Sequence, residues 1–120
     1  MIIKICGIQN KENLFCCEKN KVDFFGMIFY KKSPRNISRH NAIQLQKLSQ
    51  NLNINGVGVF VNESLIEIRK FIKDLNLKFV QLHGDENNDY IKTIKKEGVK
   101  IIKKVSIQNR IDLKTIDNYY

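Results

Sequence analysis

The feature that most constrains this chain is a regular alternation of short apolar runs and longer amphipathic stretches. Five runs rich in β-branched or aromatic residues are each followed by a segment with helical spacing, at a repeat of roughly 22 to 32 residues. This cadence predicts parallel strands joined by right-handed crossover helices. The expected strands cover residues 1–5, 22–30, 57–61, 77–82 and 99–105, and the expected helices cover residues 11–20, 39–52, 64–75, 88–97 and 112–119.

A parallel sheet with this alternation is either doubly wound or part of a barrel. No G-x-G-x-x-G follows the first run and no P-loop is present, which disfavours nucleotide-binding folds. Polar residues instead recur where strands end, at Cys6, in the loop of residues 31–35, at Asn62 and at His83. Barrels build their sites in this way, so we expect an α/β fold of parallel (β/α) barrel type. A small flavodoxin-like α/β domain that binds partners is the non-barrel alternative.

Composition narrows the choice of partners and compartment. The net charge of +9 comes almost entirely from lysines scattered along every segment, which does not favour nucleic acid as the ligand. No apolar run approaches the ~20 residues that span a bilayer, so we expect no membrane partner. Cys6, Cys16 and Cys17 form no C-x-x-C pair, so neither a disulfide framework nor a metal site is indicated. Reduced cysteines are usual in the cytoplasm, which is the expected location.

Cys6 is the first candidate for chemistry. It follows the run Met1–Ile5, which we expect to be buried on both faces of the sheet, and Gly7 then turns the chain. A thiol at the carboxyl end of a parallel strand is well placed for catalysis, although free cysteine also packs as a small hydrophobe. We expect Asn10 to be the N-cap of the helix at residues 11–20 and Ser38 that of the helix at 39–52. Either Asn62 or Ser64 is the expected N-cap of the third helix.

Four segments carry a recognisable pattern: KICGI at residues 4–8, GMIFYKKSPR with IS at 26–38, GVFVN at 58–62, and VQLHG at 80–84 followed by Glu86. In their order and spacing they resemble phosphoribosylanthranilate isomerase. The resemblance implies a (β/α)8 barrel, of which residues 1–120 hold about the first five βα units as a single incomplete domain. It implies an Amadori rearrangement of N-(5-phosphoribosyl)anthranilate to 1-(2-carboxyphenylamino)-1-deoxyribulose 5-phosphate in L-tryptophan biosynthesis, without metal or organic cofactor.

The same resemblance assigns roles to individual residues. Cys6 becomes the general base, and Arg35 is suited to hold the anthranilate carboxylate through its bidentate fork. Gln81 and His83 lie two residues apart at the end of the fourth expected strand and position the substrate. A turn histidine that bonds the backbone before Gly84 is the alternative for His83. We expect Lys4 to point away from Cys6, so that Arg35 is the cation beside the thiol.

Part of the family's site has no counterpart in these motifs. The resemblance places the general acid, an aspartate, and the phosphate site on later units, and the 120-residue chain is therefore expected to lack full isomerase activity. The alternative is a non-catalytic half-barrel, meaning βα units without the rest of the barrel, which serves as a binding or assembly module. Beside the small phosphosugar-anthranilate substrate, self-association and a complementing C-terminal half are the partners considered.

Overall fold

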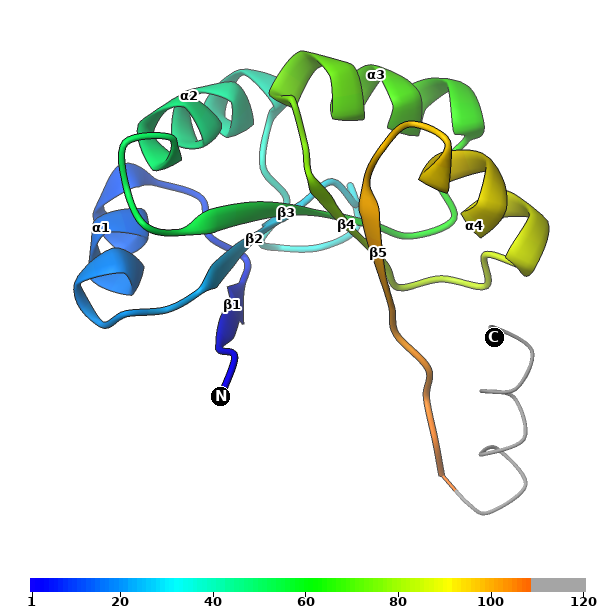
Figure 1. Ribbon diagram of the computed structural model, residues 1–120, viewed down its shortest axis with the longest axis horizontal. Helices are drawn as coiled ribbons and strands as arrows, with labels where there is room; N and C mark the ends of the chain where they lie inside the picture. The colour runs from blue at the N-terminus through cyan, green and yellow to red at the C-terminus, as the bar shows by residue number, and fades with distance from the viewer. Residues whose placement is uncertain (109–120) are drawn as a thin grey trace.

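Strands and helices alternate without exception along residues 1–108, which are the residues that the computed structural model describes (Figure 1). The predicted order of elements is confirmed over this range, and the helix expected at 112–119 lies outside it. The strands are β1 (Lys4–Cys6), β2 (Phe24–Ile28), β3 (Asn55–Phe60), β4 (Phe79–Leu82) and β5 (Lys100–Lys103), and the helices are α1 (Lys11–Lys19), α2 (Arg39–Ser49), α3 (Leu65–Leu75) and α4 (Asn88–Lys95).

Each of these four helices begins at a polar side chain that accepts a hydrogen bond from a free backbone N–H of the first turn. The predicted caps Asn10 and Ser38 are confirmed, with N···O distances of 2.8 and 3.1 Å. Of the two caps considered for α3, Ser64 is the one that accepts from Glu67 N–H. Local sequence therefore fixes where the helices start.

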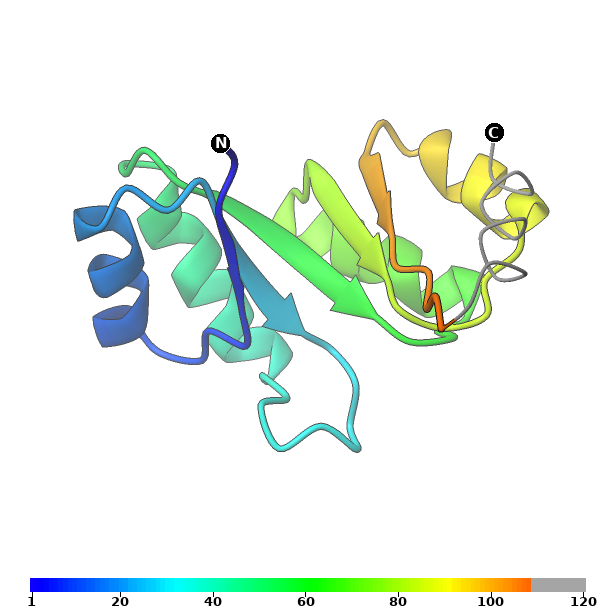
Figure 2. The same ribbon diagram turned by 90° about the horizontal axis from the view of Figure 1, so that it is seen from below.

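The strand order decides between the two parallel architectures. The sheet runs β1-β2-β3-β4-β5, and every neighbouring pair is parallel. The helices α1–α4 all lie on the convex face of the curved sheet in Figure 1, and in the view from below in Figure 2 strands lie in front of α2 and α3. A doubly wound sheet reverses its order and carries helices on both faces. The barrel-type prediction is therefore confirmed, and the flavodoxin-like alternative is wrong.

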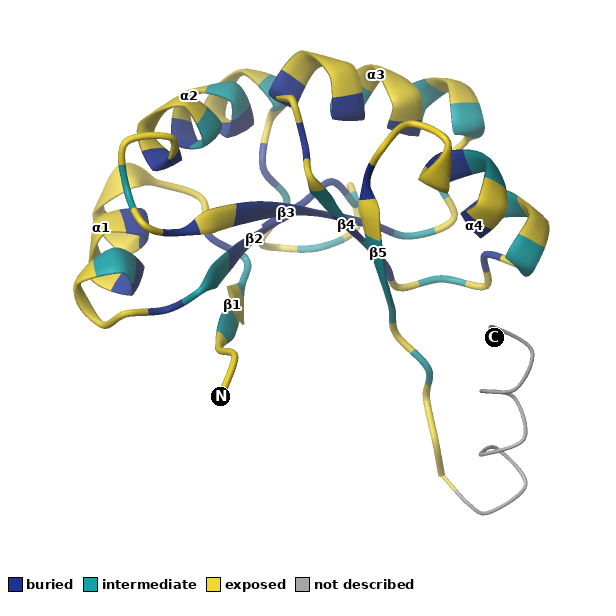
Figure 3. Ribbon diagram, viewed as in Figure 1, coloured by how far each residue is buried: buried dark blue, intermediate teal, exposed yellow. Residues whose placement is uncertain are grey.

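The core lies between the sheet and the helices (Figure 3). On α3 the predicted apolar face is confirmed, because Ile68, Ile72 and Leu75 are buried. On α2, Ala42, Leu45 and Ser49 are buried, whereas Leu48 is exposed. The helix ends at Ser49, short of the expected end at residue 52. The aromatic rings of Phe29, Phe60 and Phe71 pack against one another with centroids 4.4 to 5.5 Å apart.

The first strand differs from its prediction. We expected residues 1–5 to be buried on both faces, but β1 begins only at Lys4, and Met1, Ile2 and Ile5 are exposed. The physical reason is that β1 lies at the edge of the sheet and pairs only with β2 among the described residues. By contrast, β3 has the expected burial, with every residue after Asn55 buried.

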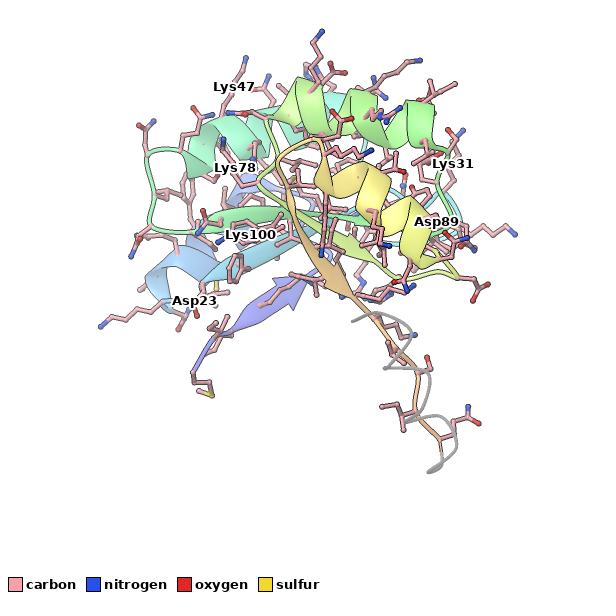
Figure 4. All side chains as sticks on the ribbon, turned by 45° about the vertical axis from the view of Figure 1, so that its right-hand side comes forward. Asp23, Lys31, Lys47, Lys78, Asp89 and Lys100 are labelled. Atoms are coloured by element: carbon pink, nitrogen blue, oxygen red, sulfur yellow. The ribbon has the colours of Figure 1, made fainter. Side chains whose placement is uncertain are left out.

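The positive charge is spread over the molecule. The labelled lysines Lys31, Lys47, Lys78 and Lys100 project from a loop, from α2 and from the starts of two strands (Figure 4). Glutamate and aspartate pair with several of the cations on α2 and α3. None of the helices within residues 1–108 is long and apolar enough to cross a bilayer.

Candidate active site

The candidate site begins where β1 ends. Cys6 is half-buried and pairs in register with Gly26 of β2, and Gly7 then takes a left-handed φ of 81°. The N–H groups of Gly7 and Ile8 both donate to the carbonyl oxygen of Gly26, at 3.0 and 2.9 Å. This short turn fixes the thiol at the carboxyl edge of the sheet, as the sequence predicts.

Arg35 lies against this turn. Its Nη1 donates to the carbonyl oxygen of Cys6 at 3.1 Å, and a Cβ on Gly7 would stand only 2.6 Å from Arg35 Cδ. Only glycine allows both the left-handed φ and this close approach. Arg35 is exposed, and its backbone N–H donates to Ser33 Oγ. The structure therefore brings Arg35 to the backbone carbonyl group of Cys6, and its place beside the thiol stays a prediction.

Lys4 is a correction. We expected it to point away from the thiol, but residues two apart in a strand share a face. Lys4 Nζ and Cys6 Sγ both crowd over Gly26, and they lie 3.3 and 3.0 Å from where a Cβ on that glycine would be. The thiol therefore has an ammonium on its own face of the sheet, in addition to the guanidinium near its carbonyl group.

Gln81 and His83 extend the site across the sheet. Gln81 pairs in register with Val59 and Ile102, and its buried Oε1 accepts no hydrogen bond from the described residues. His83 follows β4 directly, and its N–H donates to the carbonyl oxygen of Phe60 at 2.9 Å. The sequence predicted both residues at this edge of the sheet.

The charge around His83 is predominantly positive. Partial desolvation lowers the pKa of His83 although the residue is exposed, and the positive charges of Lys104 and Lys4 lower it further. The negative charge of Glu86 raises the pKa of His83, and the positive charge of Lys103 lowers it. By contrast, His40 is exposed on α2, on the other face of the sheet.

Sequence reasoning missed an ion pair next to His83. Glu86 and Lys103 are joined at 2.9 Å, with only 1% and 10% of their side chains exposed. The motif contained Glu86, but nothing assigned it a partner. The available signal was Lys103 directly after the apolar pair Ile101 and Ile102 at the end of β5, where a charge needs a compensating group.

The arrangement can bind an anion and move a proton. It places a thiol, an imidazole, a guanidinium and an ammonium at the carboxyl edge of one parallel sheet, on or beside its concave face. Within residues 1–108, no three histidine, cysteine or acidic side chains gather as metal ligands. Thiol, imidazole and cationic side chains are residue types that acid–base catalysis on an anionic substrate uses.

Comparison with known proteins identifies the family. The sequence model of N-(5'-phosphoribosyl)anthranilate (PRA) isomerase matches residues 3–119. The chain belongs to this family. Among curated isomerases, it is similar to that of Clostridium acetobutylicum, with 36% identity over 98% of this chain and 55% of the relative. It is also similar to that of Maridesulfovibrio salexigens, with 37% identity over 82% and 46%.

Solved isomerase structures give the same result. The phosphoribosyl anthranilate isomerase of Thermotoga maritima matches with a TM-score of 0.92 and 35% identity, over 99% of this chain and 58% of that one. The Pyrococcus furiosus isomerase matches with a TM-score of 0.82 and 28% identity, over 99% and 62%. The chain thus spans about half the length of the curated isomerases it matches.

Proposed function

We propose that this chain carries the base-bearing half of a phosphoribosylanthranilate isomerase site. The substrate would be N-(5-phosphoribosyl)anthranilate, and the reaction its Amadori rearrangement in tryptophan biosynthesis. The observation that carries this proposal is the convergence of Cys6, Arg35 and His83 at one edge of the sheet. A related isomerase structure is a complex with reduced 1-(o-carboxyphenylamino)-1-deoxyribulose 5-phosphate, which supports a phosphosugar ligand.

In the proposed reaction, the chain supplies the second proton transfer. A general acid protonates the ring oxygen, the bond from that oxygen to C1 breaks, and a Schiff base forms. Cys6, as thiolate, then removes the proton from C2, and the electron pair moves toward C1 and neutralises the iminium nitrogen. The resulting enolamine tautomerises to the ketone. Lys4 Nζ lies on the same face of the sheet as the Cys6 thiol, and Arg35 donates to the carbonyl oxygen of Cys6.

The other proposed contacts hold the substrate. Arg35 offers a planar fork to the anthranilate carboxylate, and bidentate pairing fixes both distance and orientation. Gln81 keeps an acceptor without a donor among the described residues, and His83 presents an imidazole at the mouth of the concave face. No cofactor enters this scheme.

The general acid and the phosphate site would come from sequence outside residues 1–120, because the resemblance places them on later units. The test is to mix the chain with the C-terminal half of the Thermotoga maritima isomerase, to confirm co-elution of the two, and to measure turnover. We expect activity in the mixture and none in the 120-residue chain alone.

Two cysteine variants sharpen this experiment. Cys6→Ser should lower kcat of the mixture by about 10²- to 10⁴-fold, the usual contribution of a general base. Cys16→Ser is the matched control because Cys16 is exposed on α1, and it should leave kcat unchanged. Full turnover by Cys6→Ser, or by the unmixed chain, would refute the assignment.

A second function, assembly, is favoured by the sheet edges. Within the described residues, β1 and β5 each pair on one side only, and Ile2 before β1 is 76% exposed. Open edges and apolar side chains invite pairing with another chain, either a second copy or a complementing half. Light scattering should show self-association that Ile2→Lys reduces. The control Ile66→Lys, at a 68% exposed site on α3, should not change it.

A further inference from the structure

A cluster around the buried carboxylate of Glu86 joins the loops that follow three neighbouring strands. We call it the turn clamp, and it consists of Asn62, Gly84, Glu86 and Lys103. Lys103 Nζ donates to Glu86 Oε2 at 2.9 Å and also to the carbonyl oxygen of Gly84. Glu86 Oε1 accepts from the backbone N–H groups of Asn62 and Gly84, both at 3.2 Å. Each carboxylate oxygen is therefore occupied.

The space within the clamp is tight. Asn62 takes a left-handed φ of 50°, and its Oδ1 accepts from Asp85 N–H at 2.7 Å. A Cβ on Gly84 would lie 2.3 Å from that same oxygen and 2.8 Å from the backbone nitrogen of Asn62. The loops after β3 and β4 thus touch backbone to backbone, and neither can move without the other.

This network fixes the backbone on both sides of His83. The N–H of His83 donates to Phe60, and both the N–H and the carbonyl group of Gly84 are bound by the clamp. Of the His83 torsions, only those of its side chain remain unrestrained by these bonds. The ion pair lies outside the hydrogen-bond ladders of the helices and strands. What it holds in place is the turn after β4.

We propose that the Glu86–Lys103 pair is a positioning element that holds His83 at the mouth of the concave face and balances the charge beside it. The proposal rests on the proposed function only in so far as His83 contacts substrate. Positioning matters because displacement of a binding group by about 1 Å can cost about 100-fold in rate.

The charges facing His83 are Lys103 and Lys104 from β5 and its end, Lys4 from β1, and Glu86 from its own loop. Glu86 is ionised: burial opposes the charge, but the hydrogen bonds from Lys103 and the backbone hold its pKa below the usual value. The paired charges of Glu86 and Lys103 thus oppose each other at His83, and either one left alone would shift its titration.

The test is an NMR titration of the two histidine side chains, His40 and His83. Glu86→Gln removes the negative charge and should lower the midpoint of His83 by about half a pH unit or more. Lys103→Met leaves Glu86 unbalanced and should raise it by a similar amount. Both variants should lower Tm, and opposite shifts of the midpoint test whether the two charges balance each other at His83.

The chain offers matched controls for both variants. Asp85→Asn removes a negative charge one residue from Glu86 at an exposed site, and Lys78→Met removes an exposed lysine at the opposite end of β4. Both should leave the His83 midpoint near its wild-type value. The proposal is overturned if Glu86→Gln and Lys103→Met move the midpoint in the same direction, or no further than these controls.

Amide hydrogen exchange decides the case if a single variant fails to fold. The double variant Glu86→Gln/Lys103→Met buries no net charge, and in it the Gly84 amide should exchange at least about tenfold faster, with Leu14 in α1 unchanged. Unchanged protection of Gly84 would overturn the proposal. None of these readouts uses a ligand, so failure of substrate binding would count against the proposed function and not against the clamp.

Discussion

Gly7 is the residue whose replacement the candidate site should tolerate least. Its φ of 81° already strains any residue with a Cβ, and Arg35 occupies the space that the Cβ would need. Gly7→Ala should therefore lower the free energy of unfolding by about 2 kcal/mol or more, measured by urea denaturation.

Gly98→Ala is the matched control for this variant. Gly98 has the same φ of 81°, but a Cβ there would meet no atom of residues 1–108 within 4 Å. It should lose only about 1 kcal/mol, from backbone strain alone. Equal losses in the two variants would contradict the contact between Arg35 and Gly7.

His83 should make stability depend on pH in a defined window. Desolvation, Lys104 and Lys4 lower its pKa in the folded chain, whereas an unfolded histidine titrates near about 6.5. Between these two pKa values the unfolded chain binds more protons than the folded chain. The stability that His83 contributes is therefore complete above about pH 6.5 and is lost as the pH falls below it.

Urea unfolding at a series of pH values across this window measures that effect. His83→Gln should flatten the fall in unfolding free energy toward acid pH, and His40→Gln, at an exposed position on α2, should retain it. If the two variants behaved in reverse, the lowered pKa would be assigned to the wrong histidine.

At the scale of elements, helix starts are set by neighbours in the sequence, and α3 offers a direct test. Ser64 Oγ accepts from Glu67 N–H at 3.2 Å, and its loss leaves that donor unpaired. Ser64→Ala should cost about 1 kcal/mol in unfolding free energy, and Ser64→Asp should retain most of the stability. A cost near zero would show that the helix is held by packing alone.

Local patterns predicted the elements because their causes are local. Caps such as Asn10 and Ser38 bond residues three positions away, and the apolar face of α3 repeats at helical spacing. The burial of β1 was predicted wrongly because it depends on which strands flank it. Lys4 was misplaced for another reason: alternation, correctly applied, puts it on the face of Cys6.

Long-range pairs were beyond what local patterns can predict. Arg35 reaches Cys6 across 29 positions and Lys103 reaches Glu86 across 17. A family motif could indicate that Arg35 and Glu86 matter, but only the register of the parallel strands brings each to its partner. The candidate site was therefore predicted in its residues and only partly in its contacts.

At the scale of the whole molecule, the strand order is what makes the site. Because consecutive strands are neighbours, all their carboxyl ends meet at one edge, and the loops after β1, β2 and β4 converge there. The helices shield only the convex face, so the concave face that carries Lys4, Cys6 and Gln81 is not covered by them (Figures 1 and 2). A phosphosugar substrate would approach on this side.

The most direct test of this account is an NMR titration of the chain with reduced 1-(o-carboxyphenylamino)-1-deoxyribulose 5-phosphate. The account predicts a saturable shift of the His83 imidazole signal with His40 unmoved. It also predicts at least about tenfold weaker binding in Arg35→Met, from loss of a bidentate carboxylate pair, and unchanged binding in the exposed-loop control Lys32→Met. No shift of His83 at millimolar ligand, or binding indifferent to Arg35, would contradict it.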